Sequence, residues 1–206
     1  SYYGKAVVGT VSGTSISFGS PVVFRSTSTF FVGAAFDSNS NKVVISYRGD
    51  SGYGTAVVGT VSGTSISFGS TATFKSAGVN HTTATFDSNS NKVIIAYQDE
   101  GNSYYGTASV GTVSGTSISF GSSVVFESGT VSNISSTFDS NLNKVVIVYN
   151  DASDGGYGTA VVGTVSGTSI SFGSPVVYKA GNSTFNSVVF DSSANKVAIS
   201  IRWVKH

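Results

Sequence analysis

The sequence predicts an all-β fold, a four-bladed β-propeller with four antiparallel strands per blade, and three observations support this prediction. The twelve residues GTVSGTSISFGS occur four times without change, beginning at Gly9, Gly59, Gly111 and Gly163. A second block, FDSxxNKVxI, follows each copy at a fixed distance. Each unit is rich in β-branched and apolar residues and is punctuated by glycine. A strand-rich unit of about 50 residues that recurs evenly is typical of a propeller blade.

Each unit contains four strand signals, which are clearest in the copy that begins at residue 30. Residues 30–36 are small and apolar, 42–47 are apolar on both faces, and 53–61 repeat that character. Residues 65–74 alternate, with Gly69 as an expected bulge. Tight turns at 38–41 and 62–64 separate these strands, and no segment has the apolar period of a helix. We name the four strands A, B, C and D in this order.

The order of the strands predicts how the ring closes. Strand A is expected innermost because its residues are small, and residues 25–29 would cross from one blade to the next. The chain starts in strand C and ends in strand B, so the N-terminal strands C and D should pair with the C-terminal strands A and B. Closure of this kind leaves no free sheet edge. The expected single domain, 1–206, has blades at 184–206 plus 1–25, 28–75, 78–127 and 130–179.

Two other assemblies of the same units remain open. We expect a monomer, but an eight-bladed ring made from two chains would use the same closure. A stacked β-solenoid is disfavoured because the unit is longer than one solenoid coil needs.

The composition excludes several classes of function. Charged residues make up 10% of the chain and the formal net charge is +1, so no basic stripe is available for nucleic acid. The longest apolar stretches, such as 30–36, are far too short to cross a membrane. The chain has no cysteine, which excludes disulfides, thiolate metal sites and cysteine nucleophiles. We expect no cofactor.

The four copies differ mainly on one face of the predicted ring. The B–C loops and the entries to strand A lie together there, and loops on a rigid scaffold often carry recognition. The position five residues before the FDS phenylalanine is occupied by Phe31, His81, Asn133 and Phe185. The position that follows strand B is occupied by Arg48, Gln98, Asn150 and Arg202. We expect these eight residues to bind a ligand by stacking and hydrogen bonding. The alternative is that duplicated loops have drifted without constraint.

The other motifs indicate structural roles rather than metal binding or catalysis. Asp37, Asn39 and Asn41 have the spacing of the first half of a calcium loop, but Lys42 stands where that loop needs glycine. We therefore expect a hairpin turn that the aspartate caps, and no metal. No pair of carboxylates recurs at a shared position near the predicted channel, and His81 is the sole internal histidine. No catalytic residue is assigned.

The unit FDSNSNKVVISY…YGTAVVGTVSGTSISFGS resembles the repetitive β-propeller repeats of marine bacteriophage and environmental proteins, and the resemblance covers the whole chain. It implies a virion- or tail-associated propeller, hence a virion or extracellular location, with adhesion or a structural role. We therefore expect a non-enzymatic module that recognises a glycan or a protein, without nucleic-acid or membrane partners. The alternatives are a purely structural repeat without a ligand and, less favoured, a glycan hydrolase.

Overall fold

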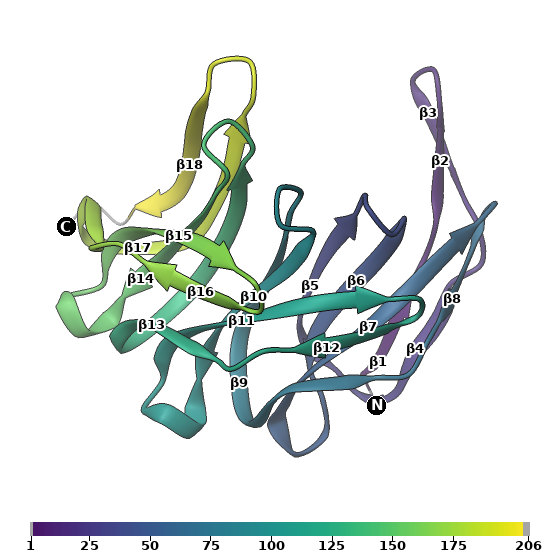
Figure 1. The fold of residues 1–206 in the computed structure, drawn as a ribbon, viewed down its shortest axis with the longest axis horizontal. Coiled ribbons are helices and arrows are strands. Elements are labelled where there is room, and N and C mark those ends of the chain that lie inside the picture. Colours follow the sequence, from purple (N-terminus) through teal and green to yellow (C-terminus); the bar gives the residue numbers. More distant parts are fainter. Residues whose placement is uncertain (1, 204–206) are drawn as a thin grey trace.

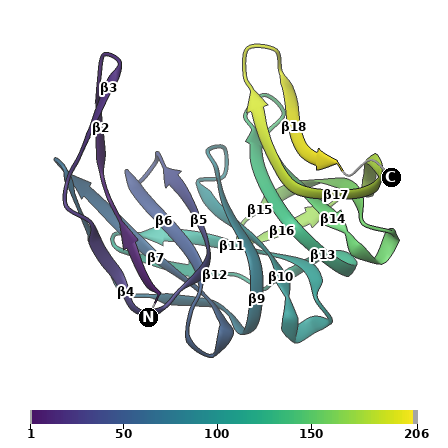
Figure 2. The ribbon, with the colours of Figure 1, turned by 180° about the vertical axis from the view of Figure 1, so that it is seen from behind.

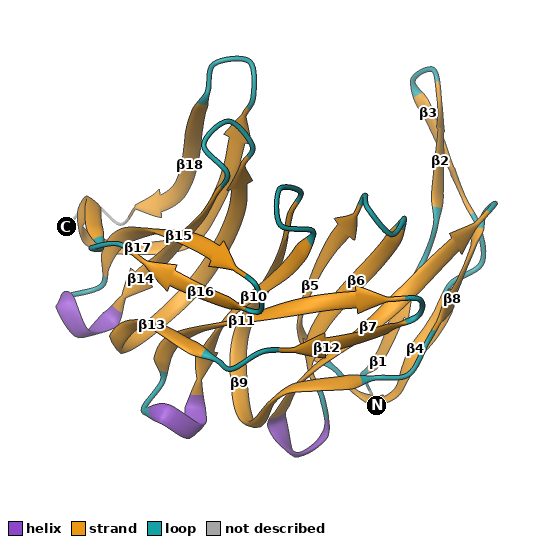
Figure 3. Ribbon diagram, in the orientation of Figure 1, coloured by secondary structure: helices purple, strands orange, loops and turns teal. Residues whose placement is uncertain are grey.

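The structure, a computed structural model, describes residues 2–203 and consists almost entirely of antiparallel strands (Figures 1 and 3). The first strands are β1 (Tyr3–Ala6), β2 (Gly9–Ser12), β3 (Ser15–Phe18), β4 (Val22–Ser28), β5 (Phe30–Asp37), β6 (Lys42–Arg48), β7 (Tyr53–Ser62), β8 (Ser65–Phe68) and β9 (Ala72–Asp87). They are followed by β10 (Lys92–Asp99), β11 (Tyr105–Ser114), β12 (Ser117–Phe120), β13 (Val124–Asp139), β14 (Lys144–Asp151), β15 (Tyr157–Ser166), β16 (Ser169–Phe172), β17 (Val176–Asp191) and β18 (Lys196–Trp203). The predicted all-β class is confirmed.

Among residues 2–203, three single-turn 3₁₀ helices interrupt the strands, each between a strand B and the following strand C. They are η1 (Asp50–Gly52), η2 (Glu100–Asn102) and η3 (Ala152–Asp154). The sequence prediction treated these segments as plain loops. They lie together at one edge of the molecule, at the bottom of Figure 3, because the same strand order recurs in every unit.

The predicted strands A, B and C are present in each unit, whereas strand D is divided. In the first complete unit, β5, β6 and β7 pair in that order, and β7 continues onto both β8 and the first residues of β9. The break between β8 and β9 falls at Gly69, whose backbone N–H donates to the carbonyl of Val58 at 2.9 Å. In place of the bulge expected at Gly69, the structure has a break that ends one strand and begins another.

The long strands β9, β13 and β17 join consecutive units. The first residues of β9 pair with β7, and its later residues pair with β10. The three complete units, centred on β6, β10 and β14, therefore share one 14-stranded pairing path. An N-terminal half-unit (β1–β4) and a C-terminal half-unit (the end of β17 with β18) flank them. This continuous path replaces the four separate four-stranded sheets that the sequence predicted.

Apolar side chains fill the space between consecutive units. Val44 and Val58 of the first complete unit pack with Val93, Ile95 and Tyr97 of the second, and all five are fully buried. The same pattern recurs between the second and third units. Both faces of strand B are covered in this way, which is why it carries apolar residues at consecutive positions, as in Val43, Val44 and Ile45, rather than at every second one.

The expected closure of the ring is not formed within the chain. Among residues 2–203, β1 pairs with β4 alone and β18 pairs with β17 alone. The strands β1 and β18 lie at opposite sides of the molecule (Figures 1 and 2). The array of units therefore stays open, and β1 to β4 do not pair with β18.

Candidate functional site

Four residues adopt the left-handed backbone conformation at the entry to strand A of the four copies. Their φ angles lie between 48° and 56°, in Phe31, His81, Asn133 and Phe185. The cause is a bulge: in β9, His81 and Thr82 lie opposite the single residue Tyr97 of β10. Similar register shifts occur in β5, β13 and β17. The repeated sequence thus produces the same local backbone four times.

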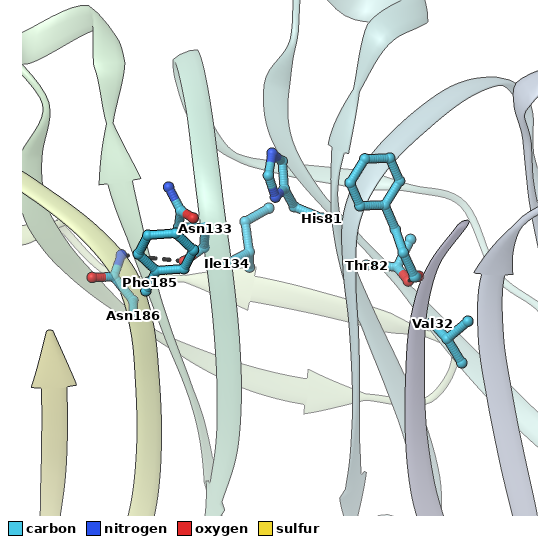
Figure 4. Close-up of a pocket in the computed structure, with 8 residues that line it drawn as sticks. Val32, His81, Thr82, Asn133, Ile134, Phe185 and Asn186 are labelled. Atoms are coloured by element: carbon cyan, nitrogen blue, oxygen red, sulfur yellow. Dashed lines mark hydrogen bonds between the residues drawn. The ribbon is translucent and has the colours of Figure 1, made fainter. Parts of the chain in front are cut away.

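These four residues converge on one pocket of about 300 Å³. Positions about 50 residues apart in sequence become neighbours because strands A of all four copies lie side by side. The pocket is also lined by the residue that follows each of them, namely Val32, Thr82, Ile134 and Asn186 (Figure 4). The first set of predicted ligand-binding residues is therefore brought together in a single site.

The walls of the pocket combine exposed aromatic rings with uncharged polar groups. The side chains of Phe31 and Phe185 are 42% and 66% exposed, and the rings of Phe31 and His81 lie 5.2 Å apart. Burial lowers the pKa of His81, so its imidazole is neutral at pH 7. None of the eight lining residues is an acid, a lysine or an arginine.

Hydrogen bonds hold the bulges in place from one unit to the next. The hydroxyl of Thr82 donates to the carbonyl oxygen of Phe31. Nδ2 of Asn186 donates to the carbonyl oxygen of Asn133 at 3.2 Å, and the hydroxyl of Tyr178 donates to Oδ1 of Asn186 at 3.1 Å. Sequence reasoning missed Asn186 and its row of equivalents. The sequence could have indicated this position, because the residue there also differs among the four copies: Val32, Thr82, Ile134 and Asn186.

The second set of predicted ligand-binding residues, those that follow strand B, lies between units rather than in the pocket. Nη1 of Arg48 donates to the carbonyl oxygen of Val79 at 3.4 Å, and Nδ2 of Asn150 donates to that of Ser183 at 2.6 Å. The side chain of Gln98 makes the same bond to Val131. Each contact joins the end of strand B to the next unit. Gln98 and Asn150 are buried, so these side chains connect units and do not line the pocket.

Arg202, the fourth member of that set, is exposed. Its guanidinium lies 5.7 Å from the ring centre of Phe185, beside the pocket. The other three members bond a neighbouring unit, and no complete unit follows Arg202 within the described residues.

The motif that resembles a calcium loop forms the predicted turn. Oδ1 of Asp37 accepts the backbone N–H groups of Asn39 and Ser40 at 2.9 and 3.0 Å. Asn41 takes the left-handed conformation with φ of 54°. The same geometry recurs at Asp87, where Oδ1 accepts from Asn89 and Ser90. The hairpin interpretation is confirmed. Within residues 2–203 no three histidine or acidic side chains gather in a way that could hold a metal ion.

Comparison of the chain with protein-family models and with curated proteins finds no match. In the part of the chain that the structure describes, no helix has the length and apolarity needed to span a bilayer.

Proposed function

We propose that the chain is a non-enzymatic β-propeller module whose pocket, at the centre of the curved array of units, binds a neutral glycan. The observation that carries this proposal is the convergence of Phe31, His81, Asn133 and Phe185, one from each copy, on a single pocket. The resemblance of the repeats to those of phage proteins supports a role in adhesion at a virion surface or tail.

The backbone conformation at these positions supports recognition over drift. A left-handed backbone costs a residue with a side chain about 1–2 kcal/mol relative to the right-handed form, and glycine avoids that cost. Asparagine and histidine tolerate the conformation better than most residues, whereas phenylalanine, present at two of the four positions, does not favour it. All four positions nevertheless carry side chains, and these point into one pocket. Strained residues of this kind concentrate at functional sites.

The chemistry of the walls favours an uncharged ligand with both apolar and hydroxylated faces. The exposed rings of Phe31 and Phe185 offer surfaces on which the C–H face of a sugar can stack. Asn133 and Asn186 supply amide groups, and neutral His81 can both donate and accept a hydrogen bond. A lining without carboxylates lacks the acid pair that glycoside hydrolysis needs, which supports binding rather than turnover.

A glycan array probed with the intact chain tests this proposal, followed by titration calorimetry with a neutral oligosaccharide that binds. We expect Phe31→Ala and Phe185→Ala each to weaken binding about tenfold or more, because each removes a stacking surface. Phe36→Ala is the matched control, since this phenylalanine is also exposed (57%) and does not line the pocket.

Two outcomes would contradict glycan binding in this pocket. One is an array on which the folded chain binds nothing, which would favour the purely structural alternative. The other is a glycan whose affinity is unchanged by both pocket variants, which would place recognition elsewhere.

A further inference from the structure

We propose that two copies of this chain close head to tail into one ring of eight blades, in which β18 of each copy pairs with β1 of the other. This inference concerns how the chain assembles and does not depend on what the pocket binds. Four separate features support it. Each feature is a contact that recurs between consecutive units of the chain. Each is absent at one position, the outer edges of β18 and β1.

The first feature is the pairing of strand B with strand C. The pairs β6–β7, β10–β11 and β14–β15 share one register, in which Val44 faces Val58 and Arg48 faces Gly54 in the first instance. The outer edge of β18, a strand B, and that of β1, a strand C, have no partner within residues 2–203. The same register would place Ala198 opposite Val8 and Arg202 opposite Gly4.

The second feature is burial, which differs between equivalent residues inside the array and at its ends. Val57 in β7 is 0% exposed, whereas its equivalent Val7 is 47% exposed. Val145 in β14 is 0% exposed, whereas its equivalent Val197 is 39% exposed. Ten of the 22 large hydrophobic side chains that are exposed among residues 2–203 lie in the two half-units, 2–28 and 184–203, which make up less than a quarter of these residues. Exposed apolar surface of this extent on a sheet edge indicates an interface.

An apolar groove lies where the missing strand belongs. It has a volume of about 390 Å³ and is lined by Ala6, Val8, Phe24, Val43 and Ile45 among others. Between complete units the equivalent space holds strand B residues such as Val44. By the shared register, the residue that fills the groove is Ala198 of the second copy.

The third feature explains why the twelve-residue block is invariant. A Cβ atom on Gly69 would lie 2.0 Å from the carbonyl oxygen of Thr116, so only glycine permits the turn of the next unit to approach. The pairs Gly19 with Thr64 and Gly121 with Thr168 repeat this contact. Gly173 occupies the same position in the fourth copy, where only the carbonyl of its own unit lies within 4 Å. Its missing partner is Thr14 of a second copy.

The fourth feature is the hydrogen bond from the end of strand B to the next unit. Arg48, Gln98 and Asn150 reach the carbonyls of Val79, Val131 and Ser183. Arg202 is the fourth in this series, and the carbonyl at the equivalent position belongs to Thr29. One docking movement, β18 onto β1, would supply all four missing contacts together.

The partner is a second copy because the single chain does not curve enough. A four-bladed ring needs four contacts between units to complete a full turn, yet after four such contacts the two half-units stand at opposite sides (Figures 1 and 2). Head-to-tail contacts close into a ring when copies are added until the rotation is complete. Each copy adds four blades, and two copies reach eight, at the upper end of the usual range.

Engineered cysteines can identify the partner directly, because the chain has no cysteine of its own. Ala198→Cys and Val8→Cys chains are prepared separately, mixed and oxidised. We expect a covalent dimer in the mixture and little in either variant alone. When both substitutions are placed in one chain, oxidation should give a dimer with two crosslinks. A crosslink within one chain, a ladder of higher oligomers, or no crosslink would each overturn the two-copy ring.

A second measurement uses a variant that changes only the exposed edge. Ala198→Arg places a charge that the free chain leaves in solvent but the ring would bury. Light scattering after size exclusion should give twice the chain mass for the wild type and a folded monomer for this variant. Ala194→Arg, also exposed and outside the edge, is the control and should remain a dimer. A monomeric wild type, or an Ala198→Arg chain that stays dimeric, would refute the proposal.

Discussion

Nη1 of Arg48 lies 2.6 Å from Oε1 of Glu100, although 52 residues separate them in sequence. The pair joins the end of β6 to the helix η2 of the next unit. Asn80 completes the group, since its Nδ2 donates to the same Oε1 at 2.8 Å and to Oε1 of Gln98 at 2.7 Å. Polar groups at the rim thus reinforce the contact that apolar side chains make between the same units.

We expect Arg48→Ala to lower the free energy of unfolding by about 1–3 kcal/mol, because it leaves the half-buried Glu100 carboxylate without its cationic donor. Urea unfolding at pH 7 measures the change. Lys196→Ala, at an exposed lysine, is the control and should change stability by less than about 0.5 kcal/mol. Equal effects of the two substitutions would show that the contact contributes nothing to stability.

Gly106→Ala should destabilise the fold more than a change at a turn glycine. A Cβ at Gly106 would lie 2.3 Å from Cε2 of Phe126, a ring packed in the core, and relief of that overlap costs about 1–3 kcal/mol or more. Gly115→Ala is the comparison, because its Cβ would meet nothing within 4 Å but its φ of +60° costs about 1 kcal/mol. Chemical denaturation of both variants gives the difference. If Gly115→Ala proved the more damaging, packing would not be the reason for glycine at 106.

Stability should fall in alkaline solution because of buried tyrosines. Burial, reinforced by the nearby carboxylate of Glu127, raises the pKa of Tyr149 well above its usual value near 10. The neutral phenol donates to Oε2 of Glu127 at 2.9 Å. Its contribution is therefore complete below pH 10 and declines above it, as the unfolded chain ionises and the folded chain does not.

The difference in unfolding free energy between wild type and Tyr149→Phe, followed from pH 7 to 11, isolates this residue. We expect the wild type to be more stable by about 1 kcal/mol at pH 7, and the advantage to shrink above pH 10. A difference that stays constant across this range would mean that Tyr149 ionises equally in both states.

The Asp87 turn should stabilise the fold without calcium. Asp87→Ala removes an acceptor of two backbone N–H groups and should cost about 1–2 kcal/mol, whereas Asp87→Asn keeps an acceptor and should cost less. Thermal unfolding with millimolar CaCl₂ and with EDTA should give the same midpoint. A calcium-dependent rise that Asp87→Ala abolishes would instead make the turn a metal site.

Much of the fold could be predicted because the units are short-range structures. The β-branched, apolar residues of 42–47 and 53–61, with the turn residues that bound them, predict β6 and β7, since pairing of strands adjacent in sequence depends on nearby residues. The division of strand D could only be suspected at Gly69, because the neighbouring Thr116 turn that packs against it comes from another unit.

The candidate site was predicted in part, for a similar reason. Alignment of the copies identified Phe31 and its equivalents because residues at one position of a repeated unit face the same centre. The alignment could not distinguish these pocket residues from Gln98 and its equivalents, which lie on the same face but whose side chains point toward the next unit. The carbonyl that Gln98 bonds, that of Val131, is contributed by the next unit and is invisible within a single repeat.

The sequence by itself determined the repeated unit, its strand order and the glycine and threonine that let one unit approach the next. Only the tertiary structure decided how far the array curves, which residues reach the pocket, and that the outer edges at Ala198 and Val8 have no strand partner within residues 2–203. The physical reason is that identical units impose the same rotation at every contact, whereas the size of that rotation arises from the packing of side chains across the contact. After four such contacts β1 and β18 stand apart, and that separation leaves a strand B edge and a strand C edge exposed.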